Sequence, residues 1–167
     1  MPGRYYLWTV GCQMNKADSE KLAAGFDRMG LKPTERIERA DIVVINTCSV
    51  RQHAEDRAYS KLGRVRDLKK SNPALKVAVM GCMVGLKTGD LEKRFPQVDV
   101  FARPQQFEPI IELIEGPIED LGGEFWPTTY AIPEGPTAYV PIVHGCNKFC
   151  TYCIVPYRRG REKSRPM

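Results

Sequence analysis

Three apolar runs, each ending beside a cysteine, constrain the fold of this 167-residue chain more than any other feature. The runs are YYLWTV before Cys12, DIVVINT before Cys48 and KVAVMG before Cys82. Continuous apolar runs of this length are typical of strands buried on both faces of a parallel sheet. Because a helix-forming segment follows each cysteine, strands and helices alternate along the chain. The sequence therefore predicts an α/β fold with an open, mostly parallel, doubly wound sheet.

Local signals predict where the other elements begin and end. Asn15 is the expected N-cap of the first helix, and Gly30 is the expected stop. Ser49 and Gln52 form an S-x-x-Q capping box at the start of the second long helix. The shorter elements expected are an edge strand at 31–34, a helix at 88–95, a strand at 98–102 and a helix at 106–114.

The first three cysteines are expected to meet in space. In a doubly wound sheet of order 2-1-3-4-5, the strands before Cys12, Cys48 and Cys82 are neighbours, and their carboxyl ends share the edge where such folds bind ligands. Buried, unpaired cysteines are the alternative for any one of them. A metal at this edge is either zinc, with His53 as a possible fourth ligand, or an iron–sulfur cluster with an open position. His53 lies inside a predicted helix, where a solvent-facing histidine is the other interpretation.

A second set of cysteines lies in the stretch GCNKFCTYC, at Cys146, Cys150 and Cys153. Ferredoxin-type clusters use four cysteines, but no spare cysteine is left for this set. The spacing therefore predicts a cluster whose fourth iron is open and able to chelate S-adenosylmethionine, the source of a radical in such sites. The alternative is a zinc knuckle in which His144 is the fourth ligand. We interpret His144 as a structural residue instead.

Composition and charge narrow the class of protein. No stretch approaches the roughly 18 apolar residues of a membrane span, so a cytoplasmic protein without membrane association is expected. Six cysteines in a reducing compartment indicate ligands or catalytic thiols more than disulfides. The net charge is +5, and its excess follows Tyr157 in the stretch RRGREKSR. That run is either a solvated surface or a site that attracts a polyanion such as RNA.

A change of composition divides the chain. Residues 116–136 are rich in proline and glycine and predict a linker. We therefore expect one domain at 1–115 with the first cysteine set. A second unit at 137–167 is expected to contain one strand, at 137–144, that leads into the clustered cysteines.

Four stretches together resemble the radical S-adenosylmethionine methylthiotransferases: GCQMNKADSE, NTCSVRQHAEDRA, MGCM and GCNKFCTYCIVPYRRGREKSR. Within that family the resemblance is strongest to the branch that converts isopentenyladenosine in tRNA, near the anticodon, to its 2-methylthio derivative. It covers essentially the whole chain. The implied fold is a methylthiotransferase N-terminal domain followed by the first strand and cluster loop of a partial TIM barrel.

The resemblance also implies roles for single residues. Cys12, Cys48 and Cys82 match ligands of an auxiliary 4Fe–4S cluster, and Cys146, Cys150 and Cys153 match ligands of the radical-generating 4Fe–4S cluster. Tyr152 matches an aromatic position beside the adenine of S-adenosylmethionine, and no side chain matches a separate catalytic residue. Isopentenylated tRNA, an electron donor such as flavodoxin or ferredoxin, and a monomeric state are also implied.

The sequence departs from the family pattern at two points, and three other functions remain possible interpretations. Gly85 stands where the family usually has Gln, and the chain ends at Met167, before most of the barrel and an RNA-binding domain. We therefore expect an N-terminal fragment without turnover of its own. The alternatives are an iron–sulfur carrier or electron-transfer module, a zinc-stabilised RNA-binding module, and a ribosomal-protein aspartate methylthiotransferase of the same family.

Overall fold

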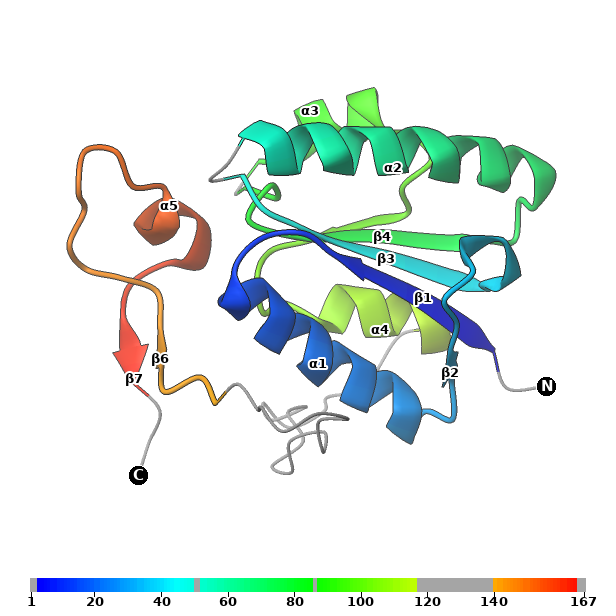
Figure 1. The fold of residues 1–167 in the computed structure, drawn as a ribbon, viewed down its shortest axis with the longest axis horizontal. Coiled ribbons are helices and arrows are strands. Elements are labelled where there is room, and N and C mark those ends of the chain that lie inside the picture. Colours follow the sequence, from blue (N-terminus) through cyan, green and yellow to red (C-terminus); the bar gives the residue numbers. More distant parts are fainter. Residues whose placement is uncertain (1–2, 50–51, 86, 117–139, 165–167) are drawn as a thin grey trace.

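The computed structural model describes residues 3–49, 52–85, 87–116 and 140–164. Their main feature is a five-stranded sheet with the order β2-β1-β3-β4-β5, in which every neighbouring pair is parallel (Figure 1). The strands are β1 (Arg4–Thr9), β2 (Lys32–Pro33), β3 (Ile42–Thr47), β4 (Lys76–Gly81) and β5 (Val100–Ala102). The predicted parallel α/β sheet and its order 2-1-3-4-5 are confirmed.

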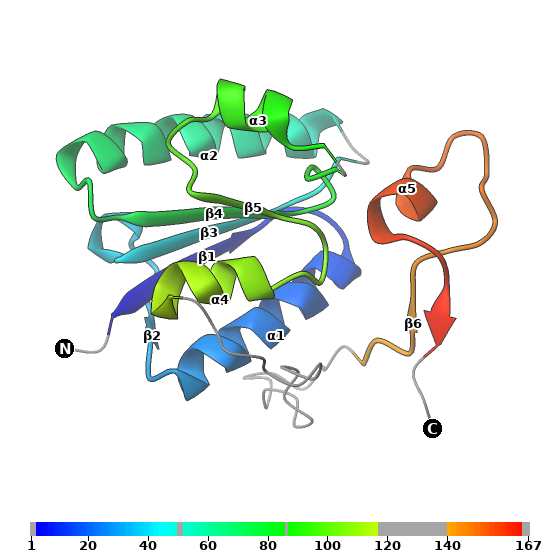
Figure 2. The same ribbon diagram turned by 180° about the vertical axis from the view of Figure 1, so that it is seen from behind.

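Helices cover both faces of this sheet (Figure 2). They are α1 (Gln13–Arg28), α2 (Gln52–Ser71), α3 (Gly89–Arg94) and α4 (Glu108–Glu115), with a 3-10 turn, η1, at Ile37–Arg39. Val43 and Ile45 of β3 pack on the face covered by α2, whereas Ile42 and Val44 pack with α1 and α4. Because successive side chains of a strand point to opposite faces, this fully apolar strand supplies both cores.

The two ends of α1 differ in how well the sequence predicts them. The helix stops as predicted at Gly30, which has φ +77° and donates from its N–H to the Asp27 carbonyl at 3.0 Å. The Leu31 N–H donates to the Phe26 carbonyl at 3.0 Å, which completes a Schellman motif. At the other end the N-cap is Cys12, and the helix already includes Asn15. The predicted cap at Asn15 is therefore wrong.

The predicted capping box of α2 is not formed either. The Ser49 hydroxyl donates to the Cys82 carbonyl at 2.8 Å, and the Gln52 amide donates to the Asp56 carboxylate at 3.0 Å. In a capping box, each of these side chains would bond to the backbone N–H of the other residue, but here both bond elsewhere.

The C-terminal segment is a small unit with its own two-stranded antiparallel sheet. It contains β6 (Val143–His144), α5 (Val155–Arg159) and β7 (Lys163–Ser164). Only the last two residues of the strand expected at 137–144 are a strand here, since 140–142 are irregular and 137–139 lie outside the described residues. Almost all of the linker expected at 116–136 also lies outside them. No helix in the described part of the chain is both long and apolar enough to cross a membrane.

We predict that Gly81→Ala strongly destabilises the fold. Gly81 has φ +98°, and a Cβ there would lie 2.4 Å from the Thr47 carbonyl oxygen, which belongs to the backbone and cannot move aside. The free energy of unfolding should fall by about 2 kcal/mol or more, measured by urea denaturation. Gly63→Ala is the matched control, because a Cβ there meets nothing within 4 Å and Gly63 lies within α2. That control should leave stability unchanged or raise it by about 0.5–1 kcal/mol.

Candidate functional site

The carboxyl edge of the sheet brings the first three predicted cysteines to neighbouring positions. Thr9 pairs with Asn46, and Thr47 pairs with Gly81, so β1, β3 and β4 end at nearly one level. β3 and β4 end directly before their cysteines, and β1 ends three residues before Cys12. The turn after β1 is tight: Gly11 has φ +143°, and a Cβ there would lie 2.8 Å from the Cys48 Cβ. A side chain at residue 11 would fill the space between the first two cysteines.

The three thiols differ in exposure. Cys48 and Cys82 are buried, and Cys12 is exposed. Burial raises the pKa of the Cys82 thiol, the Arg159 guanidinium opposes that rise, and the Cys48 and Cys12 thiols add to it. Cys12 is the only member of this set that solvent reaches, so the centre opens on the side of α1.

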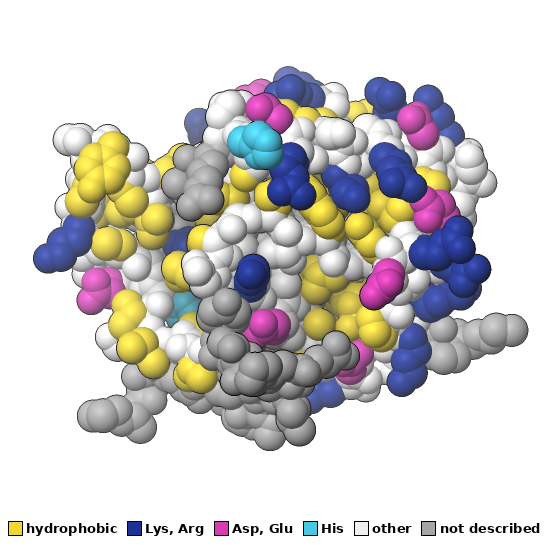
Figure 3. All heavy atoms as spheres, in the orientation of Figure 1, with side chains coloured by type: hydrophobic (Ala, Val, Ile, Leu, Met, Phe, Trp, Pro, Cys, Tyr) yellow, Lys and Arg dark blue, Asp and Glu magenta, His cyan; other side chains and the backbone are white. Residues whose placement is uncertain are grey.

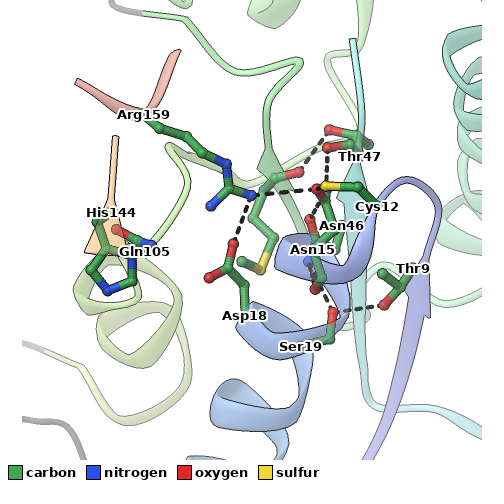
Figure 4. Close-up of polar contacts among 11 residues, drawn as sticks. Thr9, Cys12, Asn15, Asp18, Ser19, Asn46, Thr47, Gln105, His144 and Arg159 are labelled. Atoms are coloured by element: carbon green, nitrogen blue, oxygen red, sulfur yellow. Dashed lines mark hydrogen bonds and ion pairs between the residues drawn. The ribbon is translucent and has the colours of Figure 1, made fainter. Parts of the chain in front are cut away.

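A buried polar network holds this edge in place (Figure 4). The Asn15 amide donates to Asn46 Oδ1 at 3.0 Å and to the Thr47 carbonyl at 2.7 Å. The Asn46 amide donates in return to the Asn15 carbonyl at 2.8 Å and to Ser19 Oγ at 2.9 Å. Cys12 Sγ contacts Asn15 Oδ1 at 3.3 Å. Because buried polar groups are costly unless they are paired, these reciprocal bonds fix the position of α1 against β3.

Arg159 of α5 reaches into this edge from the C-terminal segment (Figure 4). Its Nη2 lies 2.9 Å from Asp18 Oδ2, and both side chains are only 2% exposed. The same nitrogen donates to Asn15 Oδ1 at 3.3 Å. Arg159 Nη1 is buried and has no hydrogen-bond partner among the described residues. The basic run after Tyr157 was interpreted as a solvated surface or as a polyanion site. Neither interpretation fits the Arg159 side chain, because it is buried.

The ionisation of this pair follows from its burial. Burial raises the pKa of the Asp18 carboxyl, and Arg159 offsets that rise only in part. Burial alone would lower the pKa of Arg159, but the charges of Asp18 and Cys82 outweigh it and raise that pKa. Arginine keeps its proton in proteins, so the centre contains a permanent buried cation.

The second cysteine set lies in the loop between β6 and α5. The Cys146 N–H donates to the Gly160 carbonyl at 3.2 Å, and the Cys153 N–H donates to the Cys150 carbonyl at 2.9 Å. Cys150 is exposed and the other two are half-buried. Tyr152 is 91% exposed, so its ring is free to meet a ligand. His144 contacts the Gln105 amide through Nδ1, which agrees with a structural role.

Gly85, the departure from the family pattern, has a clear neighbour. A Cβ at Gly85 would lie 2.1 Å from Arg158 Nη1, so the guanidinium occupies the space that a side chain would need. The Arg158 carbonyl accepts a bond from Arg103 Nη2 at 3.4 Å. The absence of a side chain at residue 85 therefore lets α5 approach the segment after Cys82.

The donor sets consist of thiols, a ligand type that both zinc and iron–sulfur clusters accept. In the described part of the chain, no three His, Cys, Asp or Glu side chains converge as they would around one metal ion. His53, the possible fourth zinc ligand, is exposed. A four-iron cluster binds each thiolate at a different iron, so its ligands stay apart. Gly11 leaves space beside Cys48, and the buried Arg159 cation lies near Cys82.

Comparisons with known proteins identify relatives of this chain. Residues 4–102, more than half of the chain, match the family described as "Uncharacterized protein family UPF0004". The chain is 43% identical over 172 residues to the tRNA-2-methylthio-N(6)-dimethylallyladenosine synthase of Dictyoglomus thermophilum. It is 44% identical over 167 residues to the protein of that name from Dehalococcoides mccartyi, and 40% identical over 177 residues to that from Pseudomonas savastanoi.

These alignments cover nearly the whole chain but only part of each relative. They include 97% of this chain and 39% of the Dictyoglomus protein. For the Dehalococcoides protein the shares are 99% and 37%, and for the Pseudomonas protein 99% and 40%. The chain therefore spans about two fifths of the length of these curated relatives.

We predict that Asp18→Ala releases the C-terminal segment from the sheet edge. The change leaves the Arg159 guanidinium buried without its carboxylate, which typically costs about 3–5 kcal/mol. Trypsin should then cleave after Arg159 much faster, and urea unfolding should show the lower stability. Asp67→Ala is the control, because the ion pairs that Asp67 forms with Arg66 and Lys70 are exposed and their removal should change little. Equal trypsin resistance of wild type and Asp18→Ala would contradict the prediction.

Proposed function

The chain belongs to the UPF0004 family, and from this premise we propose that it is the part of a tRNA methylthiotransferase that holds two iron–sulfur clusters. The observation that carries the proposal is the arrangement of two three-thiol sets linked by Arg159, which follows the second set and contacts Asp18 and Asn15 beside the first. Relatives that align over nearly the whole chain are named tRNA-2-methylthio-N(6)-dimethylallyladenosine synthases.

In this proposal Cys12, Cys48 and Cys82 hold an auxiliary 4Fe–4S cluster, and Cys146, Cys150 and Cys153 hold a second one. When bound, the clusters supply an electron for cleavage of S-adenosylmethionine and an iron site for the sulfur that is transferred. The electron comes from a carrier such as flavodoxin or ferredoxin. Three thiolates for each cluster leave one iron of each open, as both roles need.

The protein's own contribution differs at the two centres. Burial of Cys48 and Cys82 excludes water from the inner side of the first centre, and the bonds of Asn15 and Asn46 keep its turn rigid. The second loop is open, with Cys150 and Tyr152 exposed, and is accessible to S-adenosylmethionine. The Tyr152 ring is expected to pack beside the adenine.

The proposed division of the chain follows these roles. Residues 1–115 form the methylthiotransferase N-terminal domain, 116–136 the linker and 137–167 the start of the radical domain. β6 would belong to the first strand of a partial barrel. This division is supported by the separate antiparallel pairing of β6 with β7, which shares no strand with the parallel sheet.

A basic surface beside the first centre supports tRNA as the substrate. Lys16, His53 and Arg57 line a cavity of about 260 Å³ together with Gly11, the residue before Cys12. Lys61 Nζ lies 5.1 Å from the Trp8 ring centroid. Figure 3 shows Lys and Arg side chains above hydrophobic ones along α2. Cations interleaved with aromatic rings are typical of surfaces that bind nucleic acids.

The cluster assignment predicts how iron content responds to single substitutions. Anaerobic reconstitution of the wild-type chain should give about eight irons, on the premise of two four-iron clusters. Cys48→Ala and Cys150→Ala should each reduce this to about four irons, because each removes one ligand set. Addition of S-adenosylmethionine should change the electron spin resonance spectrum of Cys48→Ala, which retains the second cluster, and leave that of Cys150→Ala unchanged.

Three other results would count against this assignment. A colourless protein loaded with zinc would reject both clusters. Loss of all iron from either variant would reject two separate centres. Two clusters with no response to S-adenosylmethionine would favour an electron-transfer module.

We also predict that Lys16 and Arg57 contribute to tRNA affinity. Lys16→Ala combined with Arg57→Ala should weaken binding of isopentenylated tRNA and lower the slope of log K against log salt by about 1 for each phosphate that the protein no longer neutralises. Filter binding at several salt concentrations measures both. Lys70→Ala, at the far end of α2 and 71% exposed, is the control and should leave the affinity nearly unchanged. An equally large reduction in that control would indicate nonspecific attraction instead.

A further inference from the structure

We propose that the open edge of β1 is a docking site for an extended, acidic segment of a partner protein, which adds to the sheet as a further strand. The inference goes beyond the proposed function, because it uses neither set of cysteines. It rests on backbone groups of β1 that face no neighbouring strand among the described residues, and on a row of cations along α2 beside them. A segment with acidic residues at alternate positions complements both features.

β1 has two neighbouring strands at its start but only one at its end. β3 pairs with it from Tyr5 to Thr9, whereas β2 pairs only with Arg4 and Tyr5. Within the described ranges, no strand pairs with β1 beyond Tyr5 on the β2 side. Exposure agrees with this difference, because the β1 residues from Tyr6 to Thr9 are half-buried and those of β3 are all buried. The carboxyl half of β1 is therefore an open edge, to which another chain can pair.

The direction of the backbone groups identifies which residues are available at this edge. The Tyr5 carbonyl accepts a bond at 2.9 Å from the segment that follows β2, and the Val10 N–H donates to a β3 carbonyl at 2.9 Å. Because alternate residues of a strand direct their backbone groups to opposite edges, Leu7 and Thr9 face the open side. They present both N–H donors and C=O acceptors. An added polypeptide strand satisfies both, whereas phosphate groups supply acceptors only.

Two cations on α2 define the charge of the partner. The Arg57 guanidinium and Lys61 Nζ lie 5.7 and 5.1 Å from the Trp8 ring centroid. Lys61 Nζ also lies 3.2 Å from the Tyr6 hydroxyl, so side chains of β1 hold this cation over the strand. Neither cation forms an ion pair with another described residue. Figure 3 shows such cations along α2, so an acidic segment is favoured at this edge.

The spacing of these cations matches that of an added strand. Residues four apart on a helix are separated by about 6 Å along its axis, and residues two apart on a strand by about 6.6 Å. Carboxylates at alternate positions of the added strand can therefore each meet one of Arg57 and Lys61. Where β1 ends, Lys16 and His53 line the cavity of about 260 Å³ together with Thr9 and Arg57. That cavity has room for a further carboxylate.

The first test measures binding of a labelled peptide to the reconstituted chain. The probe is a fluorescein-labelled peptide of alternating glutamate and valine, about nine residues long. The same peptide with lysine in place of glutamate is its control, and fluorescence anisotropy gives each Kd. Arg57→Glu combined with Lys61→Glu should raise the Kd of the acidic peptide about tenfold or more. Lys70→Glu, at the far end of α2, should leave it nearly unchanged.

A backbone substitution separates strand pairing from attraction between charges. Residues 1–11 can be synthesised and ligated at Cys12 to the rest of the chain, with leucic acid in place of Leu7. The resulting ester removes the outward N–H and leaves every side chain unchanged. Compared with the all-amide ligated chain, it should raise the Kd about fivefold.

Hydrogen exchange of the wild-type chain is an independent measurement of the same contact. Bound peptide should slow exchange at the Leu7 and Thr9 N–H groups. The Trp8 N–H faces β3 and is the internal control, since its exchange should change less. Because this measurement needs no substitution, it decides the question even where the ester chain does not refold.

The outcomes separate a protein partner from RNA. Weaker binding by the ester chain, with protection of Leu7 and Thr9, supports strand addition. If charge reversal weakens binding but neither the ester nor hydrogen exchange shows an effect, the cations attract a polyanion such as RNA. That result would overturn the inference while the proposed function stands. Equal affinity for the glutamate and lysine peptides would overturn it as well.

Discussion

The parallel register of β1, β3 and β4 is the constraint on which the rest of this structure depends. Because the three strands end at one level, residues that are far apart in the sequence follow one another along a single edge. The spacing between neighbouring strands, about 4.8 Å, then determines how near the thiols come. Gly11 and Gly81 allow the chain to leave β1 and β4 at this edge, because each adopts a positive φ. At either position a Cβ would collide with residues at the end of β3. Both turns therefore need a residue without a side chain.

Burial at this edge has an electrostatic consequence. Asn15, Asn46, Asp18 and Arg159 are placed where water cannot reach them, and such groups destabilise a fold unless they satisfy one another. The asparagines do so reciprocally, whereas the ion pair is satisfied only in part, because one nitrogen of Arg159 has no partner among the described residues. The asparagine bonds hold the backbone of this edge, and the ion pair anchors α5 on α1.

Much of the fold could be predicted from the sequence because its signals are local. The apolar runs indicated the strands, and Gly30 indicated the end of α1 through a motif that spans only a few residues. Asn15 was assigned to a cap because its residue type favours caps, yet tertiary partners on β3 took its amide instead. Arg159 could not be assigned at all, since its contact with Asn15 joins positions 144 residues apart. A basic run is interpreted as surface until the fold shows which of its members is buried.

The same long-range contact couples the two cysteine sets mechanically. Arg159 follows Cys153 by one short helix, so its anchoring on Asp18 restrains the second loop relative to the first centre. The Arg158 guanidinium, from the neighbouring position, occupies the space over Gly85, close behind Cys82. A glutamine at residue 85 would have to displace that guanidinium. Gly85 and Arg158 therefore act as a complementary pair, and a substitution at either position should be judged together with the other.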